Sequence, residues 1–119
     1  MDRNSYQNLI VFQKALDLVV KAYSIASQLP DIEKYGLASQ IRRAVVSIPA
    51  NIAEGHGRRT NGDFARFLTI SLGSCRELET LFLICGRLGY VEDLADVQDD
   101  TTQVAKMLNV LIRKIRDNQ

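Results

Sequence analysis

The chain has 119 residues, of which 46% are hydrophobic and 24% are charged, and these values fit one globular domain spanning residues 1–119. A second domain is excluded, because a chain of this length has enough residues for one core only. The formal net charge of +1 points to no class of partner. No run of about 18 apolar residues and no secretory leader is visible, so we expect a cytoplasmic protein with no membrane partner.

The cysteine content fits a reducing compartment. Cys75 and Cys85 lie ten residues apart, which on one helix separates them by about 15 Å along the axis, beyond the reach of a disulfide. We expect both to be packing residues. Two cysteines and the single His56 lack the close four-ligand spacing of a zinc site, so we expect no metal and no cofactor.

Apolar residues spaced three or four apart predict helices along the whole chain. The first stripe comprises Leu9, Phe12, Leu16, Val19, Tyr23 and Ala26, and ends before Pro30. The second begins near Gly36, comprises Leu37, Ile41, Val45, Ile48 and Ile52, and ends at the Gly55-His56-Gly57 stretch.

Two further helices complete the chain. Thr60 and Asp63 resemble a capping box that opens the third helix, and Gly89 is placed to end it. The final stripe comprises Leu94, Val97, Thr101, Val104, Leu108, Leu111 and Ile115. Strand signals are absent, so the sequence predicts an all-α fold, an antiparallel up-down four-helix bundle.

The third predicted helix has two apolar stripes. One comprises Phe64, Leu68, Ser71, Cys75, Leu78, Phe82 and Cys85, and the offset second comprises Phe67, Ile70, Ser74, Leu81, Ile84 and Leu88. A central position in the bundle would explain both stripes. The interpretation we favour is that the second stripe meets another copy of the chain, with Phe67, Ile70, Leu81 and Ile84 as the subunit contact.

Pro49 falls inside the second helix, where it removes one backbone hydrogen bond and predicts a kink. A polar stripe that includes Ser47, Asn51 and Glu54 passes the same region. An ordinary solvated face is one interpretation. The short side chains of Ser47 and Asn51 are more typical of close helix contacts with shared hydrogen bonds, so we assign Ser47, Pro49, Asn51 and Glu54 a structural or interface role.

Charge is uneven along the chain. Residues 34–88 have eight Lys or Arg against four Asp or Glu, and residues 89–100 have five acids and no base. Residues 101–119 have a net charge of +3. Acids early and bases late in the last helix suit the helix macrodipole. Arginine outnumbers lysine ten to five, and we take Arg42, Arg43, Arg58, Arg59 and Arg66 as candidate phosphate contacts.

The second helix also has a family signature. The segments Tyr35–Leu37, Gln40–Ala44 and Ser47–Gly55 resemble the signature of the four-helix-bundle proteins encoded in bacterial 23S rRNA intervening sequences. The match continues in order through Phe64, Phe67-Leu68, Gly73-Ser74, Glu77-Leu78-Glu79-Thr80 and Leu88-Gly89-Tyr90. It covers nearly the whole chain, although the last helix has no family motif.

The resemblance implies a bundle that assembles into a ring-like homo-oligomer, with a pentamer expected. A related accessory protein of diversity-generating retroelements shares that architecture and is associated with nucleic acid and a reverse transcriptase. For the intervening-sequence family itself, the resemblance implies no defined biochemical activity.

The sequence offers residues for three kinds of function. The first is a nucleic-acid-binding oligomer, RNA favoured over DNA, whose repeated subunits multiply a modest basic patch; the lack of tryptophan predicts shape-driven or nonspecific binding. The second is a scaffold for a protein partner, in which arginines pair with acids, as Arg76 with Glu79 and Asp63 with Arg66. The third is an enzyme using Glu54 and His56, which we do not expect, because residues two apart on a helix point to different sides.

Overall fold

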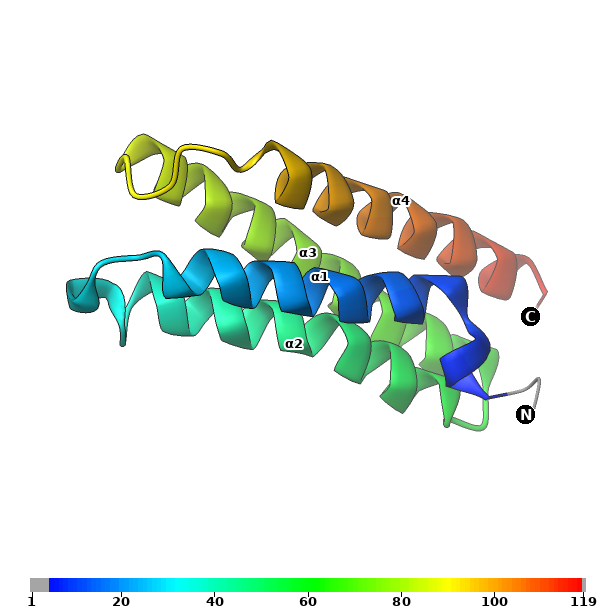
Figure 1. Ribbon diagram of the computed structural model, residues 1–119. Helices are drawn as coiled ribbons and strands as arrows, with labels where there is room; N and C mark the ends of the chain where they lie inside the picture. Colours follow the sequence, from blue (N-terminus) through cyan, green and yellow to red (C-terminus); the bar gives the residue numbers. More distant parts are fainter. Residues whose placement is uncertain (1–4, 119) are drawn as a thin grey trace.

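The computed structural model describes residues 5–118, in which four α-helices and no strand occur. The helices are α1 (Ile10–Ser27), α2 (Leu37–His56), α3 (Asn61–Arg87) and α4 (Ala95–Asp117). Short 3-10 helices, η1 (Tyr6–Asn8) and η2 (Asp31–Glu33), precede α1 and α2. The helices alternate in direction, and the α2–α3 connection lies at the same end of the molecule as the two termini (Figure 1). The predicted all-α four-helix bundle is confirmed.

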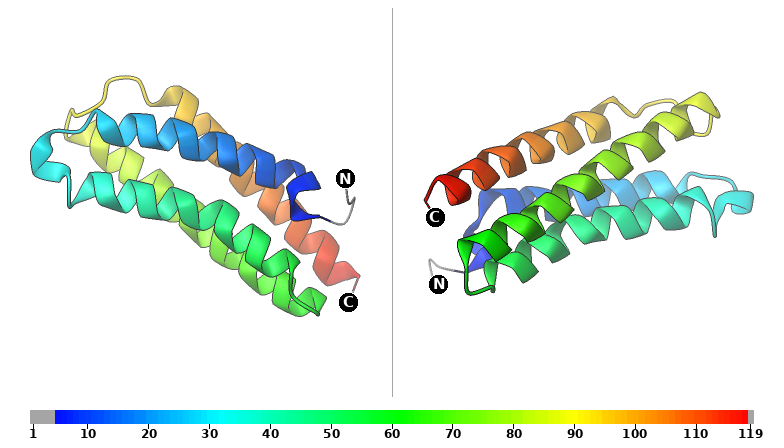
Figure 2. Two further views of the ribbon diagram at one scale, coloured as in Figure 1. Left: turned by 60° about the horizontal axis from the view of Figure 1, so that its bottom comes forward. Right: turned by 180° about the vertical axis from the view of Figure 1, so that it is seen from behind.

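Neighbouring helices pack in cyclic order. Helix α1 contacts α2 and α4, and α3 contacts the same two helices, while the diagonal pairs do not approach each other. Figure 2 shows this arrangement from two further sides. Each helix therefore has one face toward a shared core and two flanks toward neighbours.

Local signals set the helix ends as predicted. The Thr60 side chain accepts a hydrogen bond from the Asp63 amide at 3.1 Å, which satisfies one free donor at the start of α3. At the other end of α3, Gly89 has φ of +74°, and the Tyr90 amide donates to the Cys85 carbonyl at 3.1 Å. Only glycine adopts this left-handed conformation without steric cost, and it ends the helix.

The core faces of α2, α3 and α4 follow the predicted stripes, but that of α1 does not. The predicted core residues Leu16 and Tyr23 are exposed, while the side chains that α1 buries are Val11, Phe12, Ala15, Leu18, Ala22, Ile25 and Ala26. The two stripes have the same spacing and are offset around the helix. The buried stripe includes three alanines, whose small side chains let α1 pack closely on its neighbours.

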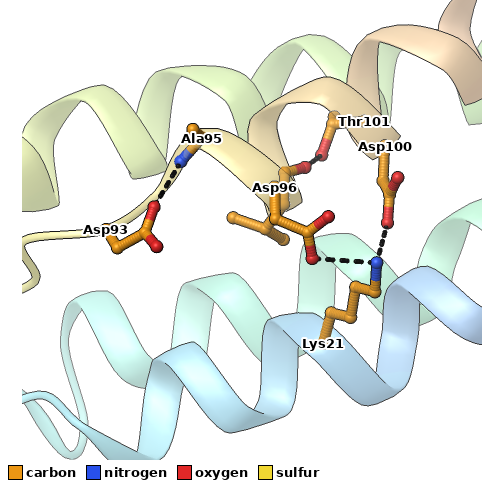
Figure 3. A network of polar contacts seen from close by, with 7 residues as sticks. Lys21, Asp93, Ala95, Asp96, Asp100 and Thr101 are labelled. Atoms are coloured by element: carbon orange, nitrogen blue, oxygen red, sulfur yellow. Dashed lines mark hydrogen bonds and ion pairs between the residues drawn. The ribbon is translucent and has the colours of Figure 1, made fainter.

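An ion-pair network joins α1 to α4 near the start of α4 (Figure 3). The Lys21 ammonium lies 2.9 Å from an Asp96 oxygen and 2.5 Å from an Asp100 oxygen. The hydrogen bond to Asp100, followed by that to Asp96, raises the pKa of Lys21 above its ordinary value. Asp96 also lies in the first turn of α4, while Lys114 and Arg116 lie in its last turn. Asp96 thus complements the helix macrodipole, and Asp96 and Asp100 both bind α1.

Candidate nucleic-acid interface

The candidate site is built on the α2–α3 pair, whose helices approach closely at their connection. A Cβ atom added to Gly55 would lie 2.6 Å from the Phe67 Cβ and 3.1 Å from a Phe64 ring carbon. Real Cβ atoms do not pack at 2.6 Å, so only glycine permits this approach. The glycine that sequence analysis treated as a helix breaker is the last buried residue of α2 and sets the spacing of the pair.

Small polar side chains join the same two helices further along. The Ser47 and Ser74 hydroxyls lie 2.8 Å apart, and the Asn51 amide donates to the Ser47 carbonyl at 2.8 Å and to the Ser47 hydroxyl at 2.9 Å. The buried Ser71 hydroxyl donates to the Ile48 carbonyl at 2.8 Å. The Ser47 hydroxyl and the Asn51 amide nitrogen are therefore used within the subunit.

Pro49 lies inside α2 and is buried. The helix continues for seven residues beyond it, to His56. Ser71 approaches from α3 at the preceding residue, Ile48, and bonds its carbonyl oxygen. The carbonyl that loses its amide donor to Pro49 is that of Val45, so the Ser71 hydrogen bond joins α3 to α2 beside the proline and does not replace the lost bond.

Three of the five candidate arginines gather at the α2–α3 connection. The guanidinium carbons of Arg58 and Arg66 lie 4.7 Å and 4.6 Å from the centre of the Phe67 ring. These are cation–π distances, so the ring holds both cations at the surface. Arg59 is exposed beside them. We refer to Arg58, Arg59, Arg66 and Phe67 as the arginine–phenylalanine cluster.

Carboxylates accompany two of these arginines. Arg58 lies 2.6 Å from a Glu54 oxygen, and Arg66 lies 3.5 Å from an Asp63 oxygen. All four side chains are substantially exposed to water, so each pair adds about 0 to 1 kcal/mol and leaves the cations exchangeable. Arg59 takes part in no ion pair within residues 5–118.

The other two arginines form a separate group. Arg42 and Arg58 are 16 residues apart along α2 and the turn that follows it, a distance of about 24 Å at the rise of a helix. Arg42 is half-buried and donates to the Lys34 carbonyl at 3.4 Å. Arg43 is exposed and lines a hollow of about 440 Å³ with Ser47, Ser74 and others. One subunit therefore does not bring the five predicted arginines into one patch.

Of the four residues predicted as the subunit contact, three are at least partly exposed and one is buried. Ile70 and Ile84 on α3 are 42% and 39% exposed, and Phe67 is half-buried under its two arginines. Leu81 is only 4% exposed. Its assignment as a subunit contact requires correction, because the stripe lies on the flank of α3 and at Leu81 the subunit's own helices cover that flank.

A second exposed apolar group escaped sequence analysis. Leu16, Val20 and Tyr23 of α1 and Val46 of α2 are exposed. Tyr23 and Val46 line the same hollow between the two helices. Leu16 and Tyr23 belong to the apolar stripe that predicts α1, and the signal that could have found this surface is the alanine-rich stripe offset from it.

The residues considered for catalysis are engaged in other contacts. Glu54 pairs with Arg58, and the His56 ring packs edge-on against Phe64 with centroids 5.5 Å apart. Burial raises the pKa of the Cys75 thiol to about 12 and also raises the pKa of Cys85, so neither is a thiolate at neutral pH. Across the described part of the chain, no group of three His, Cys, Asp or Glu side chains is placed to hold a metal ion. No helix in that part is long and apolar enough to cross a membrane.

These features define a class: a small four-helix bundle with a cluster of exposed arginines at the connection of α2 and α3. Its sequence matches the model of the 23S rRNA-intervening sequence proteins over residues 7–110, and the chain belongs to that family. A crystal structure of a protein of unknown function from the S23 ribosomal protein family of Bacteroides thetaiotaomicron has the same fold, with a TM-score of 0.81 and 28% identity. The similarity covers 87% of this chain and 96% of that one. No curated protein matches the chain.

Proposed function

We propose that this protein is a non-catalytic homo-oligomer, a ring and specifically a pentamer, that binds nucleic acid through a basic surface formed by several subunits. The observation that supports it best is the arginine–phenylalanine cluster, which holds two guanidinium groups at the surface on one aromatic ring. Exposed carboxylates pair with them only weakly, so phosphates can replace Glu54 and Asp63.

Assembly matters to this proposal because a single subunit has few cations in any one place. The cluster has three arginines and two neighbouring carboxylates, Glu54 and Asp63. Arg42 and Arg43 lie about 24 Å away along α2. Repeating both groups around a ring would place cations at regular intervals, as phosphates are along a strand. The family name refers to 23S rRNA, which supports RNA over DNA as the ligand.

Fluorescence anisotropy with a labelled RNA tests the proposal at salt concentrations between 50 and 200 mM. We expect log affinity to fall linearly with log salt concentration, because bound cations displace counterions from phosphates. Arg58→Glu with Arg59→Glu, and Arg42→Glu with Arg43→Glu, should each abolish binding and leave helical content unchanged. The charge-matched control combines Arg76→Glu with Arg87→Glu, outside both groups. Binding that does not weaken as salt rises, or that survives either double substitution, contradicts the proposal.

The assembly step has its own test. Ile84→Asp places a charge on the half-exposed stripe of α3 and should reduce the mass measured by light scattering to that of one chain. Leu83→Asp, a control at a neighbouring exposed residue outside the stripe, should leave the mass unchanged. An Ile84→Asp variant that keeps the wild-type mass would remove the proposed subunit contact.

A second candidate function is a protein-interaction scaffold without nucleic-acid binding. Three ion pairs between residues three or four apart favour it, because each neutralises the charge of one arginine. They join Arg58 to Glu54, Arg66 to Asp63 and Arg76 to Glu79. The anisotropy experiment separates the two: a scaffold assembles normally and retains no RNA at 50 mM salt.

A further inference from the structure

A hollow of about 500 Å³ lies between the start of α1 and the last turns of α4, apart from the arginine groups. Its lining is mostly apolar and comprises Leu9, Ile10, Val11, Met107, Val110 and Leu111. Leu9, Met107 and Leu111 are half-buried and Val11 is buried, so they form the floor. The two helices leave between them a space of the size that small-molecule sites have.

Two large apolar side chains at the mouth of this hollow remain in water. Ile10 is 69% exposed and Val110 is 44% exposed. An apolar ligand in the hollow would remove both from water, at about 25 cal/mol for each Å² covered. The hollow therefore favours an occupant with a hydrocarbon part.

The charges around the hollow are of one sign. Lys106 and Lys114 line it, and no acidic residue does. With Val110 between them, the two lysines are spaced four and four apart, so they follow one face of α4. Neither lysine forms an ion pair with any residue between positions 5 and 118. The occupant they favour has an anionic group beside its hydrocarbon part.

The extent of the hollow limits the occupant to a small molecule. Lys106 and Lys114 are eight residues apart, about 12 Å along the axis. Further along the contact between α1 and α4, the next hollow is lined by Asp17 and Asp100 and also by Lys14 and Lys21, so its charges balance. A longer acidic partner, such as a helix of another protein, would extend onto this hollow and gain no further net attraction there.

The geometry points to a binding site for a single-chain amphiphilic carboxylate, a medium-chain fatty acid. Its alkyl chain lies against Leu9, Met107 and Leu111, under Ile10 and Val110. Its carboxylate lies at the rim, between the ammonium groups of Lys106 and Lys114. The site shares no residue with the proposed nucleic-acid surface, so either can fail without the other.

Isothermal titration with decanoate, below the concentration at which it forms micelles, tests the site on the full chain. We expect saturable binding of one decanoate per chain, and weaker binding of the uncharged decanol. The chain has two methionines, Met1 and Met107, so the methyl signal of Met107 is assigned in an NMR spectrum with a Met107→Leu variant. That signal should shift as decanoate is added.

Three variants locate the binding. Val110→Asp introduces a carboxylate at an exposed position of the mouth and should abolish binding while the chain stays folded. Lys106→Ala with Lys114→Ala should weaken binding about tenfold, from the loss of two exposed ion pairs. Lys34→Ala, at the opposite end of the bundle, should change nothing.

Other results overturn the assignment. These are an absence of saturable heat together with an unmoved Met107 signal, equal affinity for decanol and decanoate, or binding that survives Val110→Asp. If Val110→Asp instead lowers the mass of the assembly and wild-type protein takes no decanoate, the hollow is a contact between copies of the chain.

Discussion

The contact between α2 and α3 and the contact between α1 and α4, here called the α2–α3 and α1–α4 seams, are stabilised by different kinds of side chain. Between α2 and α3, a glycine and three serines bring the backbones together. Gly55 lies against Phe67, the Ser47 and Ser74 hydroxyls share a hydrogen bond, and Ser71 donates one to the Ile48 carbonyl. Between α1 and α4, Lys21 reaches across to two aspartates, and two hollows open on the same seam. Small side chains bring the backbones of α2 and α3 close at Gly55, although a hollow opens beside Ser47 and Ser74, whereas long charged side chains join α1 to α4.

The difference separates two roles within one small domain. The tight seam fixes the frame on which the arginine–phenylalanine cluster sits, since Phe67 packs against Gly55 on one side and holds Arg58 and Arg66 on the other. The loose seam leaves room for a ligand and tolerates change. Substitutions should therefore be costly on the first seam and mild on the second.

The largest effect is expected at Gly55. Gly55→Ala should lower the free energy of unfolding by about 3 kcal/mol, because its Cβ would overlap the Phe67 Cβ and force the helices apart. Gly73→Ala is the matched control, since that helical glycine has open space around it and alanine favours helix by about 1 kcal/mol. Urea unfolding measures both. Equal effects at the two glycines would show that the seam is not tight.

Alkaline unfolding tests whether the interior behind the tight seam is dry. Burial raises the pKa of the Cys75 thiol from 9.0 to about 12, so the folded chain keeps a proton that the unfolded chain loses above pH 9. This group leaves stability unchanged below pH 9 and lowers it by about 1.4 kcal/mol per pH unit from there toward pH 12. Cys75→Val should remove that share of the pH dependence. Identical alkaline profiles for wild type and variant would mean that water reaches the thiol.

Loss of one hydrogen bond on the tight seam should have a moderate effect. Ser71→Ala removes the donor to the Ile48 carbonyl, next to Pro49, and should cost about 1 kcal/mol in urea unfolding. Thr80→Ala is the control, because its hydroxyl bonds a carbonyl of its own helix at an exposed position. A Ser71→Ala variant as stable as that control would indicate that this bond adds nothing between the helices.

The smallest effect is expected on the loose seam. Lys21→Met removes both ion pairs to α4 and should lower the melting temperature slightly, less than Ser71→Ala does. The deficit should vanish at 1 M salt, where exposed charges are screened. A large deficit that persists in salt would show that the network is a principal link between α1 and α4, and the contrast between the seams would fail.

Sequence reasoning reached the fold because its signals are local. Periodic apolar stripes, the Thr60 cap, the left-handed Gly89 and the stop before Pro30 all act within one helix or its ends, and all appear in the structure. The sequence was a poorer guide to which face of each helix is buried. The apolar stripe that predicts α1 includes Leu16 and Tyr23, which are exposed, and the stripe that α1 buries is offset from it.

The candidate site shows the same division. The sequence by itself determined the all-α bundle, the family signature and the set of arginines, because these depend on residue type and spacing along the chain. Only the tertiary structure decided that Arg58 and Arg66 share Phe67, that Arg42 and Arg43 lie apart from them, and that Leu81 is covered. Those outcomes depend on how far each helix is rotated about its axis, which is fixed by packing against its neighbours and not by the spacing of residues within it.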